Sequence, residues 1–450
     1  MNNFVRNLVL ILILNCLTVG PVWGQKPLTI EEAIQIALKN NSTLKSAYET
    51  YRASKSYAFG AWGNFLPRAD VSLGRNQYQK DRQFFSTEPQ RMVFDPVKND
   101  SVPDYSFRSK SAYDFGISVS QTIFDGGLSW FNLGQGRALL SSSEYSYRQT
   151  KQETIVAVKI ASFGLLKAQT LLEVQQDVVK RAQQQLDIAK ARYDLGSASL
   201  SDYLKAKVLI SNAKLDLVNA KNAVEIARAT LNTVLGISVN SPTSIDAKLE
   251  YQKYEVNLDN SLKTALATHP LVEKSKADLD ASEAQLMSAW SRHLPSLTAR
   301  FDYGWFDARF PDNRRDWGRI DSWAVSFVVS MNIFSGFQIT SDINAAKHSK
   351  RAADERLSQQ KKDLELQIRT AYLNVQSAEE KISVTQEAAK SAEQDLNLTQ
   401  EKYNLGAAST LELLDAQVSY RTAKTNEVNA LFDYTVAVSE LEKALGKYAN

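Results

Sequence analysis

Apolar and polar residues alternate along two matching segments of the chain, a period of two that is typical of β-strands with two different faces. The segments end at Ile123 and Ile333, and shorter alternating segments, Val71–Leu73 and Leu297–Trp305, precede them. The strands fit the ~9–11 residues of a tilted membrane-spanning strand. Standing alone, they would fit a half-buried strand of a soluble sandwich better. The apolar faces are Trp323, Val325, Phe327, Val329, Met331 and Ile333 in one segment and Tyr113, Phe115, Ile117, Val119 and Ile123 in the other.

Two longer stretches, about 127–195 and about 337–405, carry apolar residues at helical spacing instead. A helix of about 67 residues would be about 100 Å long at 1.5 Å per residue. No compact soluble domain encloses such a helix, so it needs partners along its whole length, as in a coiled coil. Shorter amphipathic helices are predicted at Ile30–Asn40 and Leu44–Trp62.

Matching residues divide the chain into two copies of one plan. Trp62 matches Trp290 at an offset of 228, whereas Gly196 matches Gly406 at an offset of 210. The difference falls within Asn76–Arg108 of the first copy, which we therefore expect to be an exposed loop. The predicted copies are 25–250 (strand pair about 66–124, long helix about 127–195, return helix about 199–235) and 251–450 (strand pair about 295–334, long helix about 337–405, return helix about 409–445).

The first 24 residues are typical of a secretory signal peptide. Arg6 precedes the apolar run Leu8–Leu14, and we place cleavage after Gly24. A lipoprotein signal at Cys16 is the alternative, with Asn15 as a poor preceding residue. After residue 24 no hydrophobic run approaches the ~20 residues of a membrane-spanning helix. Cleavage would remove the only cysteine, which excludes disulfides and thiolate sites in the mature chain.

The charge balance and the scarce histidines exclude several function classes. A formal net charge of +3 over 450 residues is too balanced for a nucleic-acid binder. The three histidines, His269, His293 and His348, lack the HExxH spacing of a zinc hydrolase. No phosphate-binding loop or nucleophile elbow occurs either. We therefore expect no catalytic residues, no metal site and no cofactor.

The number of predicted strands requires more than one copy of the chain. Four strands per chain cannot close a barrel, and an open edge in lipid would leave backbone groups without partners. Two copies would give eight strands, whose side chains fill the interior, whereas three copies would give twelve. Small residues on the second face favour the wider bore. The sequence therefore predicts a homotrimer in contact with outer-membrane lipid.

The duplicated plan, the Leu-Pro pairs before the first strands, and the strand ends Ile123–Gly127 and Ile333–Gly336 resemble TolC-type outer-membrane efflux proteins. The resemblance covers Leu28 to Gly446. It implies an α+β membrane protein: a trimeric 12-stranded outer-membrane β-barrel continued by a long α-helical coiled-coil periplasmic tunnel. It also implies docking to a periplasmic adaptor (membrane fusion) protein and to an inner-membrane pump of RND or ABC type. The function implied is a passive exit duct for efflux or type I secretion.

Two helix-hairpin tips are the strongest local signals. Their glycines suit the left-handed residue that ends a helix, and a serine three residues later suits the start of the return helix. This structural account is complete without a function. The resemblance adds that the tips form the periplasmic entrance and contact the adaptor. The candidate adaptor-contact residues are Leu195, Gly196, Ser199, Leu405, Gly406 and Ser409.

The candidate gate combines two acidic residues with part of a latch. Glu412 and Asp415 share a helix face, and three chains would place six carboxylates around the entrance. The structural alternative is that Glu412 caps its helix and complements the helix dipole. Tyr403 and Asp202 match two members of the tyrosine–aspartate–arginine latch that the resemblance implies. Ala408 stands in place of its arginine, so closure would rely on another group, with Lys205 or Lys402 as candidates.

A rival from another class is a periplasmic coiled-coil adaptor or scaffold without a membrane barrel. Such adaptors usually carry one helical hairpin beside β domains, not a duplicated pair of strands with aromatic outer faces. An adaptor would leave the membrane in a salt wash, whereas a barrel requires detergent. An enzyme is disfavoured because no catalytic constellation is present.

Overall fold

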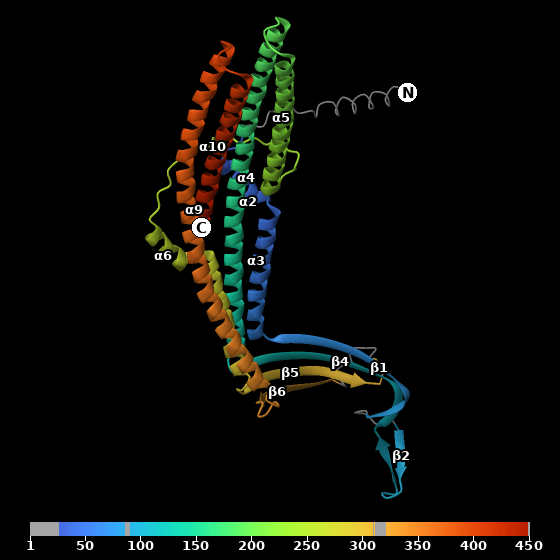
Figure 1. Cartoon of the computed structure of the whole chain (residues 1–450). Helices are drawn as coiled ribbons and strands as arrows, with labels where there is room; N and C mark the ends of the chain where they lie inside the picture. The colour runs from blue at the N-terminus through green and yellow to red at the C-terminus, as the bar shows by residue number, and fades with distance from the viewer. Residues whose placement is uncertain (1–26, 86–90, 309, 311–320, 449–450) are drawn as a thin grey trace, which may run out of the picture. The chain divides into compact units, whose positions relative to one another are not determined.

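The computed structural model describes residues 27–85, 91–308, 310 and 321–448 (Figure 1). The predicted signal peptide and its cleavage after Gly24 lie outside these residues. The chain forms two compact units. The first contains residues up to 49, 146–272 and 361 onward, and the second contains 50–145 and 273–360.

Two helices of equal length dominate the chain, and each is followed by a shorter return helix. The expected long helices of about 127–195 and about 337–405 are α4 and α9, of 67 residues each. Glycine ends α5 in the left-handed conformation, with φ +71° at Gly236. The bounds are α4 Leu128–Asp194, α5 Leu200–Leu235, α9 Gln338–Asn404 and α10 Thr410–Ala444.

Helix α4 contains an apolar stretch that differs from the expectation for this chain. Among the described residues it is the one helix long and apolar enough to cross a membrane by length and composition, with a mean hydropathy of 1.5 over 18 residues. The expectation that no such run follows residue 24 was therefore wrong. This stretch is apolar because it packs inside the protein: Val158 and Leu165 on α4 are fully buried in a hydrophobic core with Leu231 of α5.

Short helices precede each strand pair. Helix α2 begins with a complete capping box, in which the side chains of Thr29 and Glu32 each bond the other residue's backbone N–H. The second predicted helix of the first half ends earlier than Trp62, because a 3₁₀ turn replaces its last part. The bounds are α2 Ile30–Asn40, α3 Ser42–Gly60, η1 Ala61–Phe65, α6 Leu258–Thr268 and α7 Pro270–Ser291.

Four antiparallel strands form one sheet in the order β1-β4-β5-β6. The register places Val119, Phe301 and Val325 in one cross-strand row, and Ile117, Tyr303 and Trp323 in the next. Because paired residues share a face, the predicted alternation gives the sheet one apolar face and one polar face. The bounds are β1 Arg68–Phe85, β4 Ser106–Phe124, β5 Ser296–Asp307 and β6 Asp321–Ser330.

The strands differ from the sequence expectation at both ends of the predicted pattern. Strand β6 ends at Ser330, so Met331 to Ile333 lie outside it. Most of Asn76–Arg108 is strand and not loop, because β1 and β4 remain paired as far as Phe85 and Ser106. Two further strands, β2 Arg91–Asp95 and β3 Asp100–Asp104, form a hairpin between them. Polar residues occupy both faces of this extension, so its period of two is invisible in the sequence.

Candidate functional site

The candidate site lies at the two turns that join the long helices to their return helices. Gly196 and Gly406 have φ values of +72° and +78°, the left-handed conformation predicted for both. The N–H of Ser197 bonds the carbonyl of Arg192 and the N–H of Ala407 bonds that of Lys402, each at 2.8 Å. These bonds cap the last carbonyls of α4 and α9 in the same way. The two tips therefore have the same backbone conformation at the turn.

The two return helices begin with different side-chain caps. Ser409 forms the predicted capping box with Glu412: Ser409 N–H donates to the carboxylate at 2.6 Å, and Glu412 N–H donates to Ser409 Oγ at 3.2 Å. Ser199 accepts the N–H of Asp202 at 3.2 Å, but the Asp202 carboxylate accepts the Ser199 hydroxyl at 2.8 Å. Aspartate is one methylene shorter than glutamate. The capping box is therefore present in the second tip and only half-formed in the first.

Glu412 and Asp415 lie in the first turns of α10, and both side chains are exposed. Hydrogen bonds from the backbone and hydroxyl of Ser409, with the charge of Lys402 nearby, hold the pKa of Glu412 below its ordinary value. Glu412 is consequently ionised at neutral pH. The capping role considered in the sequence analysis is real, and it leaves the charge of this carboxylate accessible to solvent.

Both tips carry a large exposed aliphatic side chain. Leu195 is 83% exposed and Leu405 is 85% exposed, each directly before the turn glycine. Leu411, near the start of α10, is 75% exposed. Exposed apolar groups gathered at a helix end indicate an interaction surface.

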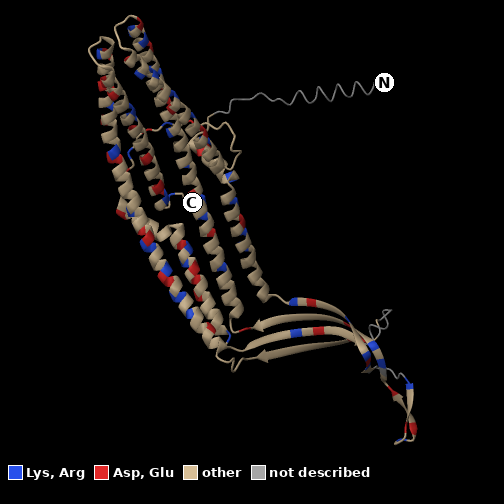
Figure 2. Cartoon of the chain, turned by 45° about the vertical axis from the view of Figure 1, so that its right-hand side comes forward, with Lys and Arg blue, Asp and Glu red and all other residues tan. Residues whose placement is uncertain are grey.

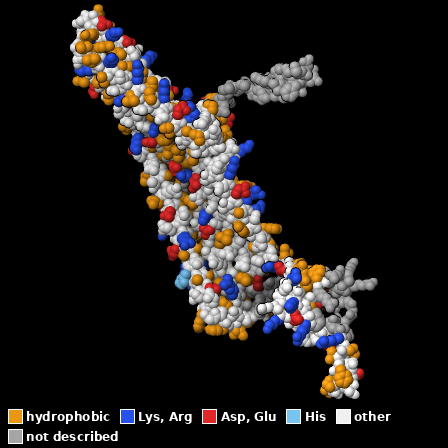
Figure 3. All heavy atoms as spheres, turned by 90° about the vertical axis from the view of Figure 1, so that its right-hand side faces the viewer, with side chains coloured by type: hydrophobic (Ala, Val, Ile, Leu, Met, Phe, Trp, Pro, Cys, Tyr) orange, Lys and Arg blue, Asp and Glu red, His pale blue; other side chains and the backbone are white. Residues whose placement is uncertain are grey.

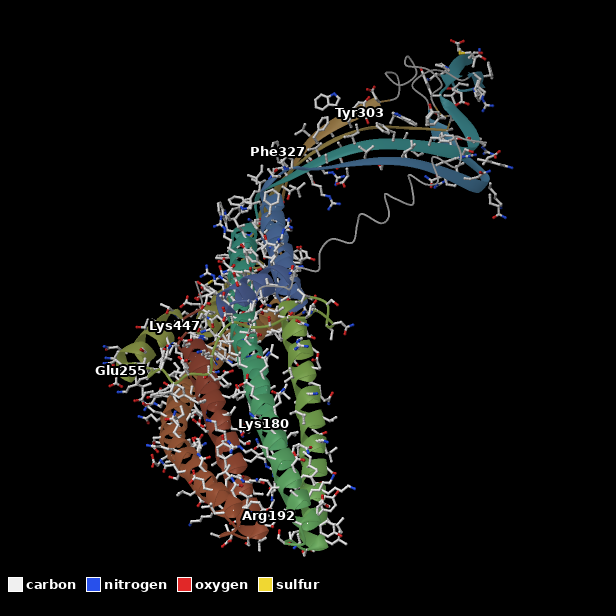
Figure 4. The ribbon with its side chains drawn as sticks, turned by 90° about the horizontal axis from the view of Figure 1, so that it is seen from above. Lys180, Arg192, Glu255, Tyr303, Phe327 and Lys447 are labelled. Carbon is white, nitrogen blue, oxygen red and sulfur yellow. The ribbon has the colours of Figure 1, made fainter. Side chains whose placement is uncertain are left out.

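Tyr403 is buried, and its partner is Arg192, which was not among the predicted site residues. Tyr403 is 3% exposed within a core that includes Leu396, Leu413 and Ala416. The guanidinium of Arg192 lies 4.9 Å from the centre of the Tyr403 ring. Figure 4 labels Arg192 at the end of α4, beside the end of α9.

The expected pairing of Tyr403 with Asp202 is not seen. Among the hydrogen bonds of the described residues, Asp202 bonds Ser199 and none joins it to Tyr403. Arg192 instead donates from Nη2 to the carbonyl oxygens of Tyr403 at 2.8 Å and Asn404 at 3.2 Å. Neither Lys205 nor Lys402 makes this contact. The signal in the sequence was a basic residue in the last turn of α4, where it can reach helix carbonyls.

The polar face of the sheet carries paired charges. Arg68 and Arg300 lie in one cross-strand row, on either side of Ser120, and Asp70 and Asp302 lie in the next. Each arginine bonds the aspartate two residues on, at 3.2 Å and 2.8 Å respectively. Figure 2 shows neighbouring basic and acidic bands along the strands. These charges neutralise one another locally, unlike the exposed carboxylate of Glu412.

His269 has a structural role. It is 4% exposed, its Nδ1 accepts the N–H of Leu271 at 3.2 Å, and its Nε2 lies 3.3 Å from the carbonyl of Lys443. Burial lowers the pKa of the imidazole. Within the described ranges, no three His, Cys, Asp or Glu side chains gather as metal ligands would.

Comparison with known proteins gives one consistent result. The family described as outer membrane efflux protein matches residues 33–237 and 261–447. The chain is 22% identical to outer membrane protein TolC of Vibrio cholerae, over 76% of this chain and 78% of the relative. It is 22% identical to alkaline protease secretion protein AprF of Pseudomonas aeruginosa, over 91% and 82%. The solved Campylobacter jejuni CmeC outer membrane channel superposes with a TM-score of 0.78 at 16% identity, over 95% of this chain and 90% of that one.

Proposed function

The chain belongs to the outer membrane efflux protein family, and we propose that three copies of it form one duct through the outer membrane and the periplasm. The family consists of transport channels and not of enzymes. This chain is accordingly an outer-membrane exit channel for efflux or secretion, with a periplasmic extension.

The four-stranded sheet is the observation that carries the proposed barrel. Strands β1 and β6 are its edges, and each edge would need a partner strand in lipid. Three sheets joined edge to edge give twelve strands. On β6 the apolar face is open, with Trp323, Phe327 and Val329 about 70% exposed (71%, 68% and 71%). This face suits lipid, whereas the paired charges of the opposite face suit a water-filled bore.

Two exposed helix faces support contact between copies in the helical part. Helices α5 and α9 lie on opposite sides of α4 and α10 (Figures 1 and 4). On α5 an exposed apolar stripe is flanked by Lys207, Lys214 and Lys221, spaced seven apart; Figure 3 looks onto this side. The stripes are Leu204, Val208, Leu215, Val218 and Ile226 on α5 and Leu366, Leu373, Val384 and Leu398 on α9.

The charges beside the two stripes are complementary. The α9 stripe is interrupted by Glu380, Glu387 and Glu401, which are exposed and spaced at multiples of seven. Heptad spacing keeps residues on one side of a coiled-coil seam. We therefore assign α5 of one copy to α9 of the next. Repeated three times, this contact closes a ring of helices.

The two halves of the chain act as structural repeats in this arrangement. Each supplies two strands of the sheet, a helix of 67 residues and a return helix. A trimer would thus present six similar hairpin tips. We assign the tips, with exposed Leu195 and Leu405, to contact with a periplasmic adaptor that connects the duct to an RND or ABC pump.

The entrance of the duct would lie at these tips. Glu412 and Asp415 from three chains would place six carboxylates near its narrowest part, where cations would be attracted and anions repelled. The proposed entrance residues are Asp202, Tyr403, Glu412 and Asp415.

Membrane extraction, mass and conductance test this function together. We expect the protein to stay in the outer membrane through high-salt washing and to leave it in detergent with the mass of three chains. The purified trimer should conduct ions in planar bilayers. Release by salt alone would favour the coiled-coil scaffold instead, and a single chain that forms a closed pore would contradict the shared barrel.

A further inference from the structure

Arg192 and Lys402 lie at matching positions of the two tips, but of the two only Arg192 contacts the other tip. They are 210 residues apart, each two residues before the end of its long helix. The carbonyl of each accepts the same turn hydrogen bond. Of these two side chains, that of Arg192 bonds the other hairpin. The two tips therefore have the same backbone hydrogen bond, but only the first tip makes this side-chain contact.

The contact of Arg192 with α9 has three parts. Its Nη2 donates to the carbonyls of Tyr403 and Asn404, the last residues of α9. These carbonyls lie at the negative end of the helix dipole, where a cation is stabilised. The guanidinium also lies 4.9 Å from the centre of the Tyr403 ring, within the range of a cation–π contact.

The chemistry of the contact favours arginine over lysine. A planar guanidinium stacks on an aromatic ring while its edge donates several hydrogen bonds. A lysine ammonium can neutralise the helix end, but it has no planar face for the ring. The buried Tyr403 ring, 3% exposed, is fixed among Leu396, Leu413 and Ala416. Arg192 thus binds a part of the second tip that is fixed by its packing.

We infer that Arg192 joins the two tips of one chain and thereby holds the entrance narrow. The inference rests on the proposed function, because it places the entrance at these tips. In this arrangement the end of α9, which leads into Glu412 and Asp415, cannot move away from the first tip unless the guanidinium leaves the α9 carbonyls. Arg192 acts as a positioning residue in place of the arginine that is missing at Ala408.

The distance between the tips tests this joint independently of conduction. The chain's one cysteine, Cys16, lies in the predicted signal peptide. Spin labels on Leu195→Cys and Leu405→Cys would therefore be the only ones in the mature chain. Labelled chains diluted with unlabelled chains report the separation within one copy. Arg192→Ala should shift the ratio of separated to joined tips about tenfold, the size expected when a charge-assisted hydrogen bond is lost.

Two matched variants distinguish this joint from a general effect of charge and from a latch through the tyrosine hydroxyl. Lys402→Ala removes a cation at the matching position and should leave the distance between the labels unchanged. Tyr403→Phe keeps the ring and the backbone carbonyl, so it should also keep the distance. A change with Tyr403→Phe would indicate that the hydroxyl holds the tips together and would overturn the role of Arg192.

Single-channel conductance tests the consequence for the entrance. Arg192→Ala should raise the conductance of the purified trimer, and Arg192→Lys should raise it less because the charge at the helix end remains. Unchanged tip distances, or separated tips with wild-type conductance, would overturn the inference while leaving the channel intact. A wild-type protein that forms no channel would overturn the proposed function, and the entrance role of Arg192 with it.

Discussion

The α4–α5 and α9–α10 hairpins have similar backbones and differ in the side chains on their surfaces. Both long helices have 67 residues, and both turns place a glycine in the left-handed conformation. Their charges differ: the segment 180–221 has eight basic and four acidic residues, and the matching segment 390–431 has four basic and six acidic residues. The hairpin shape therefore depends on a few turn and cap positions, which leaves the remaining surface free to specialise.

A similar backbone with different side chains is also found where each return helix meets a short helix. Asn41 donates from Nδ2 to the carbonyl of Val234 and accepts the N–H of Leu44. At the matching place in the second half, His269 contacts the carbonyl of Lys443 and the N–H of Leu271. Two different side chains satisfy the same kinds of backbone group. The position requires a side chain with one donor and one acceptor, not a particular residue.

The largest difference between the halves is expected at the glycines that end the return helices. A Cβ atom on Gly236 would lie 2.6 Å from the backbone of Asn40, whereas on Gly446 it would lie 3.2 Å from the His269 ring. Both residues have positive φ. Gly446→Ala should cost about 1–2 kcal/mol from the left-handed conformation. Gly236→Ala should cost roughly 3–5 kcal/mol, because backbone atoms must also move.

Thermal unfolding of the purified protein in detergent measures this order. Gly236→Ala should lower the midpoint more than Gly446→Ala, and Gly164→Ala is the matched control because a Cβ there meets nothing within 4 Å. Equal midpoints for Gly236→Ala and Gly446→Ala would show that the backbone at Asn40 moves away from the added Cβ atom at little cost in stability.

The opposite charges of the two hairpins predict the next largest effect, on assembly of the proposed trimer. Reversing the three α5 lysines (Lys207→Glu, Lys214→Glu and Lys221→Glu) should weaken each contact between copies by about 1–3 kcal/mol, at 0.2–1 kcal/mol for each exposed ion pair. The fraction of trimer at low protein concentration, measured by light scattering in detergent, should fall.

Reversal on both helices is the control for this charge pairing. Adding Glu380→Lys, Glu387→Lys and Glu401→Lys to the lysine variant should restore the trimer. The glutamate changes alone should weaken it. Added salt should reduce the differences among these variants, because exposed charges are screened. If the combined variant assembled no better than either parent, α5 and α9 would not be partners.

The sequence predicted the regular elements of both hairpins well, because their periods extend over many residues. It failed for the β1–β4 extension, where Arg75 to Gln83 is polar on both faces and no alternation remains. Pairing there is set by the neighbouring strand, which local sequence does not contain. It also missed Arg192, because a contact with backbone carbonyls across 211 residues leaves no mark on the residue type of the partner.

The acids of the second tip predict a smaller, functional difference. Glu412→Gln with Asp415→Asn should weaken the block of single-channel current by polyvalent cations severalfold, because the proposed trimer would lose six carboxylates. Asp202→Asn is the control from the first tip, where the carboxylate is bonded to Ser199. Its effect should be smaller. Unchanged block in the double variant would leave Glu412 with its capping role alone.

The smallest expected effect concerns the histidine that replaces Asn41 in the second half. Burial holds the pKa of His269 below its ordinary value of 6.5, so the folded state favours the neutral ring, while the unfolded chain binds a proton more readily. The stability contributed by the neutral ring is complete above pH 6.5 and is lost as the pH falls from there through the lowered folded pKa. His269→Asn should remove this acid sensitivity, whereas His269→Ala should cost about 1 kcal/mol at neutral pH through its lost hydrogen bonds. Thermal midpoints of the three proteins between pH 5 and 8 (roughly the range in which histidine titrates) measure the difference. If wild type and His269→Asn lost stability in parallel on acidification, carboxylates elsewhere would be responsible and the two positions would be equivalent in charge as well as in hydrogen bonding.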